Sequence, residues 1–296
     1  MDVHSVFQNG RNSIGERSST SFRKTADPFS SKYEDDSTLT GFVATDDVKV
    51  GGKTLPTFRL GIANTLQGKV AEQEIDGIMG FAKSTASHVG GPTVLEALAA
   101  AQIIPAALSG WSITRHADGD TGEVLLGALN TQLFDDSKKL TLQNVRTAQS
   151  GDGLFRMTIA SMQVGGTAVA GIAGRAGAVD VGTSAIFVPQ ADLLAIRAHF
   201  PGAVPVEEGA AFAISCDNQV GITLTIGGTP WTIEPQDLVA IPMTEAGANM
   251  CLCAIAGDED ATEWVVGTPF FKNVYHGLDV TNDAVIIAPL AVGVAV

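Results

Sequence analysis

The sequence predicts a mainly β protein of two comparable halves, with a few short helices. The chain holds 33 glycines together with many Val, Ile and Thr residues, and this composition favours strands joined by numerous turns. A pattern of strand, Gly-Gly and strand also occurs three times, at Gly51-Gly52, Gly165-Gly166 and Gly227-Gly228. Because these hairpins are spread along the chain, we expect each half to have strands of its own.

The overall composition limits the classes of function. With 296 residues, of which 45% are hydrophobic and 17% charged, the chain can form one large domain or two lobes with their own cores. Its 32 acidic and 18 basic residues give a net charge of −14, which argues against nucleic acid or an anionic membrane as a partner. No apolar run approaches the ~18 residues of a membrane helix. Residues 1–24 lack the hydrophobic core of a signal peptide.

The first strands are expected after a polar N-terminal segment. Residues 1–31 are rich in Ser, Asn, Gly and Arg and are interpreted as a surface segment. From Tyr33 the character of the sequence changes, and residues 40–55 predict a hairpin that turns at Gly51-Gly52.

Helices are few, and we expect them to serve packing. Residues 92–104 have a proline near their start and Pro105 as their stop, which predicts a helix. Residues 191–200 predict another helix, and residues 269–273 at most a short helical turn. The side chains of the first helix expected to face a core are those of Val94, Leu95 and Leu98.

An acidic turn at Asp180 is the clearest chemical feature. It lies between two apolar runs of strand type, at residues 178–179 and 185–188. A strand that stops on Asp and turns on Gly182 holds one carboxylate on a rigid support, as acid–base chemistry requires. An ordinary hairpin corner explains the same residues. Ser184 is not predicted as a nucleophile, because the second Gly and the following helix of a nucleophile elbow are missing.

Two short segments have a similar pattern, with two apolar residues followed by Gly. They are Asp76-Gly77-Ile78-Met79-Gly80-Phe81 and Glu263-Trp264-Val265-Val266-Gly267-Thr268. Asp180 precedes Gly267 by more residues than separate Met1 from Gly80. If the halves are duplicates, a counterpart of Asp180 is therefore expected upstream of this sequence.

The three cysteines allow one disulfide and leave one thiol. Cys251 and Cys253 would point to the same face of a strand, so a bridge between them would be strained. We expect Cys216 to pair with one of the two. The five histidines lack the spacing of metal ligands, so neither a metal nor a cofactor is expected.

These segments, taken in order, resemble the pepsin-like aspartic endopeptidases over nearly the whole chain. Residues 178–184 resemble the second Asp-Thr-Gly-Thr-Ser loop of that family, residues 76–80 its Asp-Gly-Ile-Leu-Gly segment, and residues 264–275 its Gly-Asp-x-Phe-Leu-Arg-x-Tyr stretch. Residues 18–52 are similar to the run through the flap, which places Tyr33 on the flap tyrosine. Residues 214–216 and 250–252 resemble the ends of the C-lobe disulfide, which implies the pair Cys216–Cys251.

The resemblance implies a bilobal, pepsin-like acid protease fold with an incomplete N-terminal lobe. The lobes would be residues 1–149, with the flap around Tyr33, and residues 150–296, with the Asp180 loop. Each lobe lends one Asp to a dyad; because like charges about 3 Å apart cannot both ionise, the pair holds one proton and activates water. The implied protein is a secreted monomer that cleaves peptides. Its catalytic residue is Asp180, and its substrate-binding residues are Tyr33, Ser37, Gly182 and Thr183.

This chain also departs from the family pattern. The first Asp-Thr-Gly-Ser loop is missing, and Asp120-Thr121-Gly122 is not its replacement because no apolar strand leads into it. Val181 stands where the family has a Thr whose hydroxyl bonds across to the other loop. Residues 33–37 contain no glycine, unlike the flap tip of the family. An alternative prediction is therefore a catalytically inactive, pepsin-like module that binds peptides or proteins.

Overall fold

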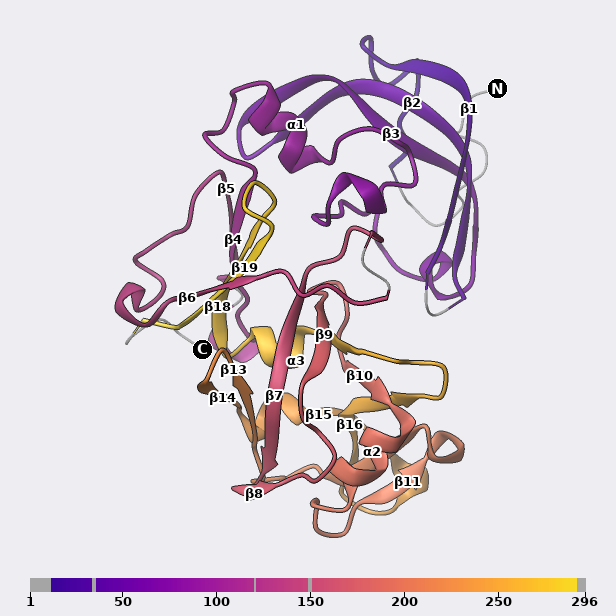
Figure 1. Ribbon diagram of the computed structural model, residues 1–296. Coiled ribbons are helices and arrows are strands. Elements are labelled where there is room, and N and C mark those ends of the chain that lie inside the picture. The colour runs from indigo at the N-terminus through magenta and orange to yellow at the C-terminus, as the bar shows by residue number, and fades with distance from the viewer. Residues whose placement is uncertain (1–11, 34–35, 120, 149–150, 292–296) are drawn as a thin grey trace. The chain divides into compact units, whose positions relative to one another are not determined.

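The computed structural model describes residues 12–33, 36–119, 121–148 and 151–291, and the chain divides into two compact units (Figure 1). The first unit comprises Met1–Ala107 with Gly151–Gly153, and the second comprises Leu108–Ser150 with Leu154–Val296. Both consist mainly of strands with a few short helices, as the sequence predicted.

Among its described residues, the first unit contains one antiparallel sheet of three long strands in the order β1-β2-β3. These are β1 (Arg23–Lys32), β2 (Thr38–Val50) and β3 (Lys53–Gln67). The β2–β3 hairpin is the predicted one, and it turns at Gly51 and Gly52, whose φ angles of 53° and 74° suit glycine.

The structure corrects the interpretation of residues 1–31 as a surface segment, because residues 23–31 belong to strand β1. It is an edge strand that pairs only with β2, and most of its side chains are exposed. Its backbone hydrogen bonds therefore form without burying an apolar face, and the strand has no alternating hydrophobic pattern to reveal it. Its register shifts between Lys24 and Pro28.

Helix α1 (Val94–Ala100) confirms the predicted first helix of the chain. Thr93 caps its N-terminus in a capping box with Glu96, and Val94, Leu95 and Leu98 are buried. In the described part of the first unit, the other helical pieces are the 3-10 turns η2 (Lys69–Ala71) and η3 (Ser84–Ala86). A small core cluster lies against the sheet and consists of Phe22, Phe42, Ala44 and Ile62.

The described part of the second unit contains two sheets. The smaller has the order β5-β4-β18-β19-β6, with β4 (Leu108–Ser112), β5 (Glu123–Leu126), β6 (Leu140–Gln143), β18 (Val274–Asp279) and β19 (Ala284–Pro289). The larger follows the path β11-β12-β16-β10-β17-β9-β7-β13-β14, with β15 on β16 and β8 on β7. Its strands are β7 (Arg156–Val164), β8 (Thr167–Ala168), β9 (Arg175–Val179), β10 (Ile186–Pro189), β11 (Val204–Val206), β12 (Ala211–Ser215), β13 (Ile222–Ile226), β14 (Thr229–Ile233), β15 (Val239–Pro242), β16 (Met250–Asp258) and β17 (Trp264–Val266).

The two remaining Gly-Gly hairpins are also confirmed, between β7 and β8 and between β13 and β14. The α-helices of this unit are α2 (Gln190–Arg197) and α3 (Thr268–Phe271), which overlap the predicted segments 191–200 and 269–273 and begin one residue earlier. Its 3-10 turns are η4 (His116–Asp118), η5 (Asp136–Lys138), η6 (Glu207–Gly209), η7 (Pro235–Leu238) and η8 (Thr244–Ala246). One large apolar cluster joins the two sheets with α2 and α3.

A disulfide joins Cys216, just after β12, to Cys251 on β16, as the family resemblance implied. Cys253 lies two residues further along β16 and is a buried free thiol. Burial raises the pKa of that thiol to about 12, so it stays protonated and unreactive at neutral pH.

His276 on β18 is fully buried in the apolar interior of the second unit. Its ring lies 4.3 Å from the ring of Phe271 and 5.9 Å from that of Trp111, measured between centroids. Within the described residues, neither ring nitrogen has a hydrogen-bond partner. Burial lowers the pKa of His276 to about 3, because the imidazolium ion would lose its hydration there without a compensating charge.

We therefore expect His276 to destabilise the second unit in acid. The folded state keeps the ring neutral, whereas the unfolded chain binds a proton near pH 6.5, so the free energy of unfolding falls as the pH drops from 6.5 toward 3. The loss between pH 7 and pH 4.5 is roughly 2.5 kcal/mol. It is measured by urea unfolding followed by tryptophan fluorescence, since Trp111, Trp231 and Trp264 all lie in this unit.

In His276→Phe, the slope of unfolding free energy against pH flattens over this range. The matched control is His116→Phe at an exposed histidine of the same unit, where the slope stays that of the parent chain. Equal slopes in the parent chain and His276→Phe contradict the prediction.

Candidate active site

The Asp180 turn follows β9 directly and is fixed to β17 by its backbone. The Asp180 N–H donates to the Val266 carbonyl at 3.1 Å, and the Thr183 N–H donates to the Asp180 carbonyl at 3.2 Å. The Thr268 N–H, at the start of α3, donates to the Thr183 carbonyl at 2.9 Å. Both ends of the turn are thus held by neighbouring secondary structure.

The Asp180 side chain is exposed and has an ordered orientation. Its Oδ1 accepts a hydrogen bond from the Gly182 N–H at 2.9 Å, and its Oδ2 accepts one from the Thr183 hydroxyl at 2.6 Å. These two donors fix the plane of the carboxylate. Each oxygen retains a lone pair for a water or a substrate group. Asp180, Gly182 and Thr183 therefore form one compact constellation.

Gly267 allows the turn to lie directly on the residue after β17. A Cβ atom at Gly267 would lie 2.1 Å from the Ala185 carbonyl oxygen and 2.3 Å from the Thr183 carbonyl oxygen. Both contacts are with backbone atoms and far shorter than a van der Waals contact, so only glycine fits here.

A buried polar hub around Asp192 connects three elements of the second unit. Asp192 on α2 is 3% exposed and accepts hydrogen bonds from Arg175 on β9 at 2.9 and 2.8 Å. The same carboxylate accepts the indole N–H of Trp264 on β17 at 2.8 Å. Because its charge is paired and hydrogen-bonded, Asp192 can be buried. Asp192 was not among the predicted site residues, although an Asp among the apolar residues of a predicted packing helix is a visible signal.

The neighbouring residues of the turn face in different directions. Val181 is partly buried against the apolar core, where it offers no hydroxyl group to another loop. Ser184 is exposed. Asp120, which is not predicted to be catalytic, lies outside the described residues.

The residues around the expected flap tip lie in the first unit, between β1 and β2. The Tyr33 N–H donates to the Ser37 carbonyl at 2.9 Å, and the Asp36 N–H donates to the Tyr33 carbonyl at 3.1 Å. Asp36 has a φ of 61°, a left-handed conformation that glycine adopts more easily. Ser37 is 1% exposed, and its hydroxyl accepts a hydrogen bond from the Val70 N–H at 3.1 Å. Glu34 and Asp35 lie outside the described residues.

Among the described residues, no group of three or more His, Cys, Asp and Glu side chains is arranged to hold a metal ion. None of the helices found there combines the length and the apolar character needed to cross a membrane.

Comparison with known proteins identifies the family. A family model described as "Eukaryotic aspartyl protease" matches residues 4–290. The chain is 27% identical over 263 residues to the aspartic-type endopeptidase ctsD of Aspergillus fumigatus, covering 87% of this chain and 52% of that protein. It is 27% identical over 283 residues to syncephapepsin of Syncephalastrum racemosum, covering 95% of this chain and 68% of that protein. This chain belongs to the eukaryotic aspartyl protease family.

The fold is similar to that of an aspartic proteinase from Irpex lacteus, with a TM-score of 0.78 and 19% sequence identity. The alignment covers 97% of this chain and 88% of that one. The pepsin-like fold class is thereby confirmed. The chain spans about half to two thirds of the length of the first curated relatives that it matches, namely 52%, 64% and 47%.

We expect Gly267→Ala to disrupt the Asp180 turn, because the new methyl group must displace the backbone of residues 183–185. The expected loss in free energy of unfolding is about 1–3 kcal/mol. Urea unfolding followed by tryptophan fluorescence measures it, and hydrogen exchange at the Thr268 amide reports the turn itself.

Gly80→Ala is the matched control, because a Cβ atom at Gly80 meets nothing within 4 Å. Its stability is expected to stay within about 0.5 kcal/mol of the parent chain. If Gly267→Ala is equally neutral and leaves the Thr268 amide protected, the close packing of the turn on Gly267 is refuted.

Proposed function

We propose that this chain acts as an aspartic-type endopeptidase in which Asp180 is one carboxylate of the catalytic dyad. The observation that carries the proposal is the Asp180 carboxylate itself: it is exposed, backed by β17, and oriented by Gly182 and Thr183. A rigidly held, solvent-facing carboxylate is the group that water activation needs.

In the proposed reaction two carboxylates share one proton, because like charges at close range cannot both ionise. The ionised oxygen takes a proton from a bound water, and the protonated carboxyl polarises the peptide carbonyl. The two carboxyls titrate as a coupled pair. The printed sequence supplies Asp180, whereas the partner carboxylate would come from an Asp-Thr-Gly-Ser loop that this sequence does not contain.

The finer assignments follow from the family resemblance. Tyr33 and Ser37 in the flap, with Gly182 and Thr183, are proposed to bind the peptide substrate. The lobes would be residues 1–149 and 150–296, the protein a monomer without metal or cofactor, and its location extracellular. The disulfide Cys216–Cys251 supports an oxidising compartment.

A second candidate is a pepsin-like module that binds peptides or proteins without cleaving them. The position of Val181 favours it, because this apolar side chain packs on the core where a bridging hydroxyl would otherwise support a dyad. The two candidates differ in one observable, the cleavage of peptide bonds.

The test measures cleavage of a denatured protein substrate by the purified chain between pH 2 and pH 7. If the chain is an endopeptidase, Asp180→Asn lowers the rate at least about 10³-fold, because an amide cannot serve as the proton acceptor. The matched control is Asp260→Asn, an exposed aspartate of the same unit, which should cleave at the parent rate. A folded chain that cleaves nothing over this range, but retains peptides, supports the binding module instead.

A further inference from the structure

A largely buried ion pair joins Arg156 on β7 to Glu263, the residue before β17. The Arg156 Nε donates to Glu263 Oε2 at 2.8 Å, and the Nη2 of the same guanidinium donates to Oε1 at 2.7 Å. The side chain of Arg156 is 1% exposed and that of Glu263 is 16% exposed. Two parallel hydrogen bonds are the arrangement that a guanidinium and a carboxylate form best. The arginine can therefore be buried, because its charge is paired.

The ion pair crosses strand β9, at whose end the Asp180 turn begins. In the larger sheet β9 lies between β7 and β17 (Figure 1). Arg156 is opposite Ala178 on one side, and Val265, two residues after Glu263, is opposite Ala178 on the other side. Because residues two apart in an extended chain share a face, the two charged side chains lie on the same face of the sheet as Ala178. They therefore meet over β9.

The small residues of β9 leave space for this crossing. On the face that the ion pair crosses, β9 contributes only the alternate residues Ala176 and Ala178. Thr158, the next residue of β7 on that face, is exposed, whereas Arg156 is buried. The burial of Arg156 is thus a local feature of the crossing point.

The two strands that the ion pair joins also hold the backbone next to the Asp180 carboxylate. The Val179 N–H donates at 2.8 Å to the carbonyl of Phe155, the neighbour of Arg156 on β7. The next amide along the chain, that of Asp180, donates at 3.1 Å to the Val266 carbonyl on β17. Two successive amides therefore bind the two opposite neighbours of β9. The spacing of these neighbours decides whether both hydrogen bonds can form.

The chain that leads into β7 contacts both partners of the ion pair. The Asn144 side-chain oxygen accepts the Arg156 N–H at 2.7 Å, and the Val145 N–H donates to the Arg156 carbonyl at 3.1 Å. The Thr147 hydroxyl donates to Glu263 Oε2 at 3.4 Å. Both the backbone of the arginine and the carboxylate are thus bound from a third direction.

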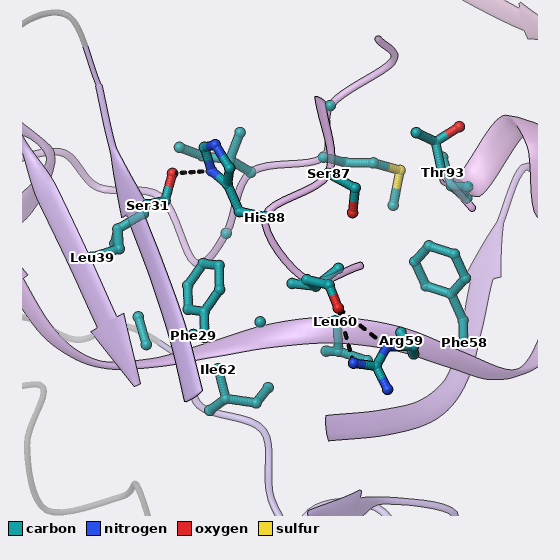
Figure 2. Close-up of a pocket in the computed structure, with 18 of the residues that line it drawn as sticks. Phe29, Ser31, Leu39, Phe58, Arg59, Leu60, Ile62, Ser87, His88 and Thr93 are labelled. Carbon is teal, nitrogen blue, oxygen red and sulfur yellow. Dashed lines mark hydrogen bonds between the residues drawn. The ribbon is translucent and has the colours of Figure 1, made fainter. Parts of the chain in front are cut away.

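An arginine of the first unit forms a more exposed ion pair. Arg59 on β3 donates to the Val89 carbonyl at 3.0 Å (Figure 2) and to the Asp27 carboxylate at 3.0 Å. The side chains of Arg59 and Asp27 are 36% and 57% exposed. Water can replace either partner of such a surface pair, so the pair constrains the strands little. A guanidinium that is buried, as that of Arg156 is, has no such replacement.

We propose that Arg156 and Glu263 are positioning residues for the Asp180 carboxylate. Their ion pair keeps β7 and β17 at a fixed spacing across β9. This spacing preserves the backbone hydrogen bonds of Val179 and Asp180, and with them the direction in which the carboxylate points. The catalytic meaning of this orientation rests on the proposed function, whereas the orientation itself is measured without a substrate.

The test is the double variant Arg156→Met/Glu263→Gln, which removes both charges and leaves no buried ion unpaired. We expect the Val179 and Asp180 amides to exchange hydrogen at least about tenfold faster, relative to the amides of β12. Strand β12 is a suitable reference because it pairs with β11 and β16, away from the ion pair. In NMR spectra the Gly182 amide, which donates to Asp180 Oδ1, should change its proton shift as that hydrogen bond weakens.

Arg156→Lys is the second variant, and it keeps the proposal testable if the double variant does not fold. The lysine retains the buried positive charge but cannot bind both carboxylate oxygens through a planar fork. We expect the same change in the Gly182 resonance and at least about threefold faster exchange of the Val179 and Asp180 amides, relative to β12.

Two controls separate orientation from charge and from overall stability. Arg59→Met/Asp27→Asn removes the same kinds of charge from the exposed ion pair and should leave the Val179 and Asp180 amides unchanged. Leu224→Ala creates a cavity in the apolar cluster at β13 and so destabilises the whole second unit. It should accelerate exchange at β9 and β12 alike, which leaves their ratio at the parent value.

Kinetics provide a further readout if the chain cleaves peptides. The double variant Arg156→Met/Glu263→Gln is then expected to lower kcat at least about tenfold with KM unchanged, because the carboxylate loses its orientation and the substrate keeps its contacts. A parent chain that cleaves nothing contradicts the proposed function alone. The exchange ratio and the Gly182 resonance still decide the role of the ion pair.

The proposal is overturned if the variants at Arg156 behave as Leu224→Ala does, with an unchanged exchange ratio and an unchanged Gly182 resonance. The ion pair would then contribute to overall stability alone. In an active chain, a rise in KM at constant kcat would also overturn it, because it would show that the pair supports substrate binding and not the direction of the carboxylate.

Discussion

The close approach of the Asp180 turn to Gly267 is the constraint on which the candidate active site depends. Without a side chain at Gly267, the Thr183 and Ala185 carbonyl groups reach the backbone at the end of β17. That approach brings the Thr268 amide to the Thr183 carbonyl and places the Asp180 amide on Val266. The carboxylate is oriented because close packing fixes the conformation of the backbone that carries it.

The buried polar hub around Asp192 also helps to hold the strands that carry the turn. Strand β17 has to stay in register between β9 and β10, and Asp192 secures this by accepting hydrogen bonds from Arg175 and Trp264. The burial of this carboxylate is tolerated because one cation and one neutral donor bind it. The hub therefore contributes specificity to the packing around the site, whereas the apolar cluster contributes most of the driving force.

Short stretches of the sequence predicted the features that depend on interactions between residues close together in the chain. The Gly-Gly turns need positive φ angles, helix α1 has a capping residue and an apolar face, and Asp180 ends an apolar run, so each was visible in a short window. Strand β1 was not, because its edge position leaves its side chains polar. The role of Gly267 as a contact surface was also hidden, since the contact depends on residues more than 80 positions away in the chain.

The response of this structure to acid depends on particular buried groups more than on the net charge of −14. Burial opposes ionisation of Asp46, but hydrogen bonds from Ser21 and Ser19 outweigh it and lower the pKa of that carboxyl. Its stabilising contribution is lost when the pH falls through that lowered pKa, and the contribution of neutral His276 is lost from about pH 6.5 downward. Any stability that this chain retains in acid must therefore come from interactions that do not titrate. The disulfide Cys216–Cys251 and the large apolar cluster are such interactions, and both lie in the unit that carries Asp180.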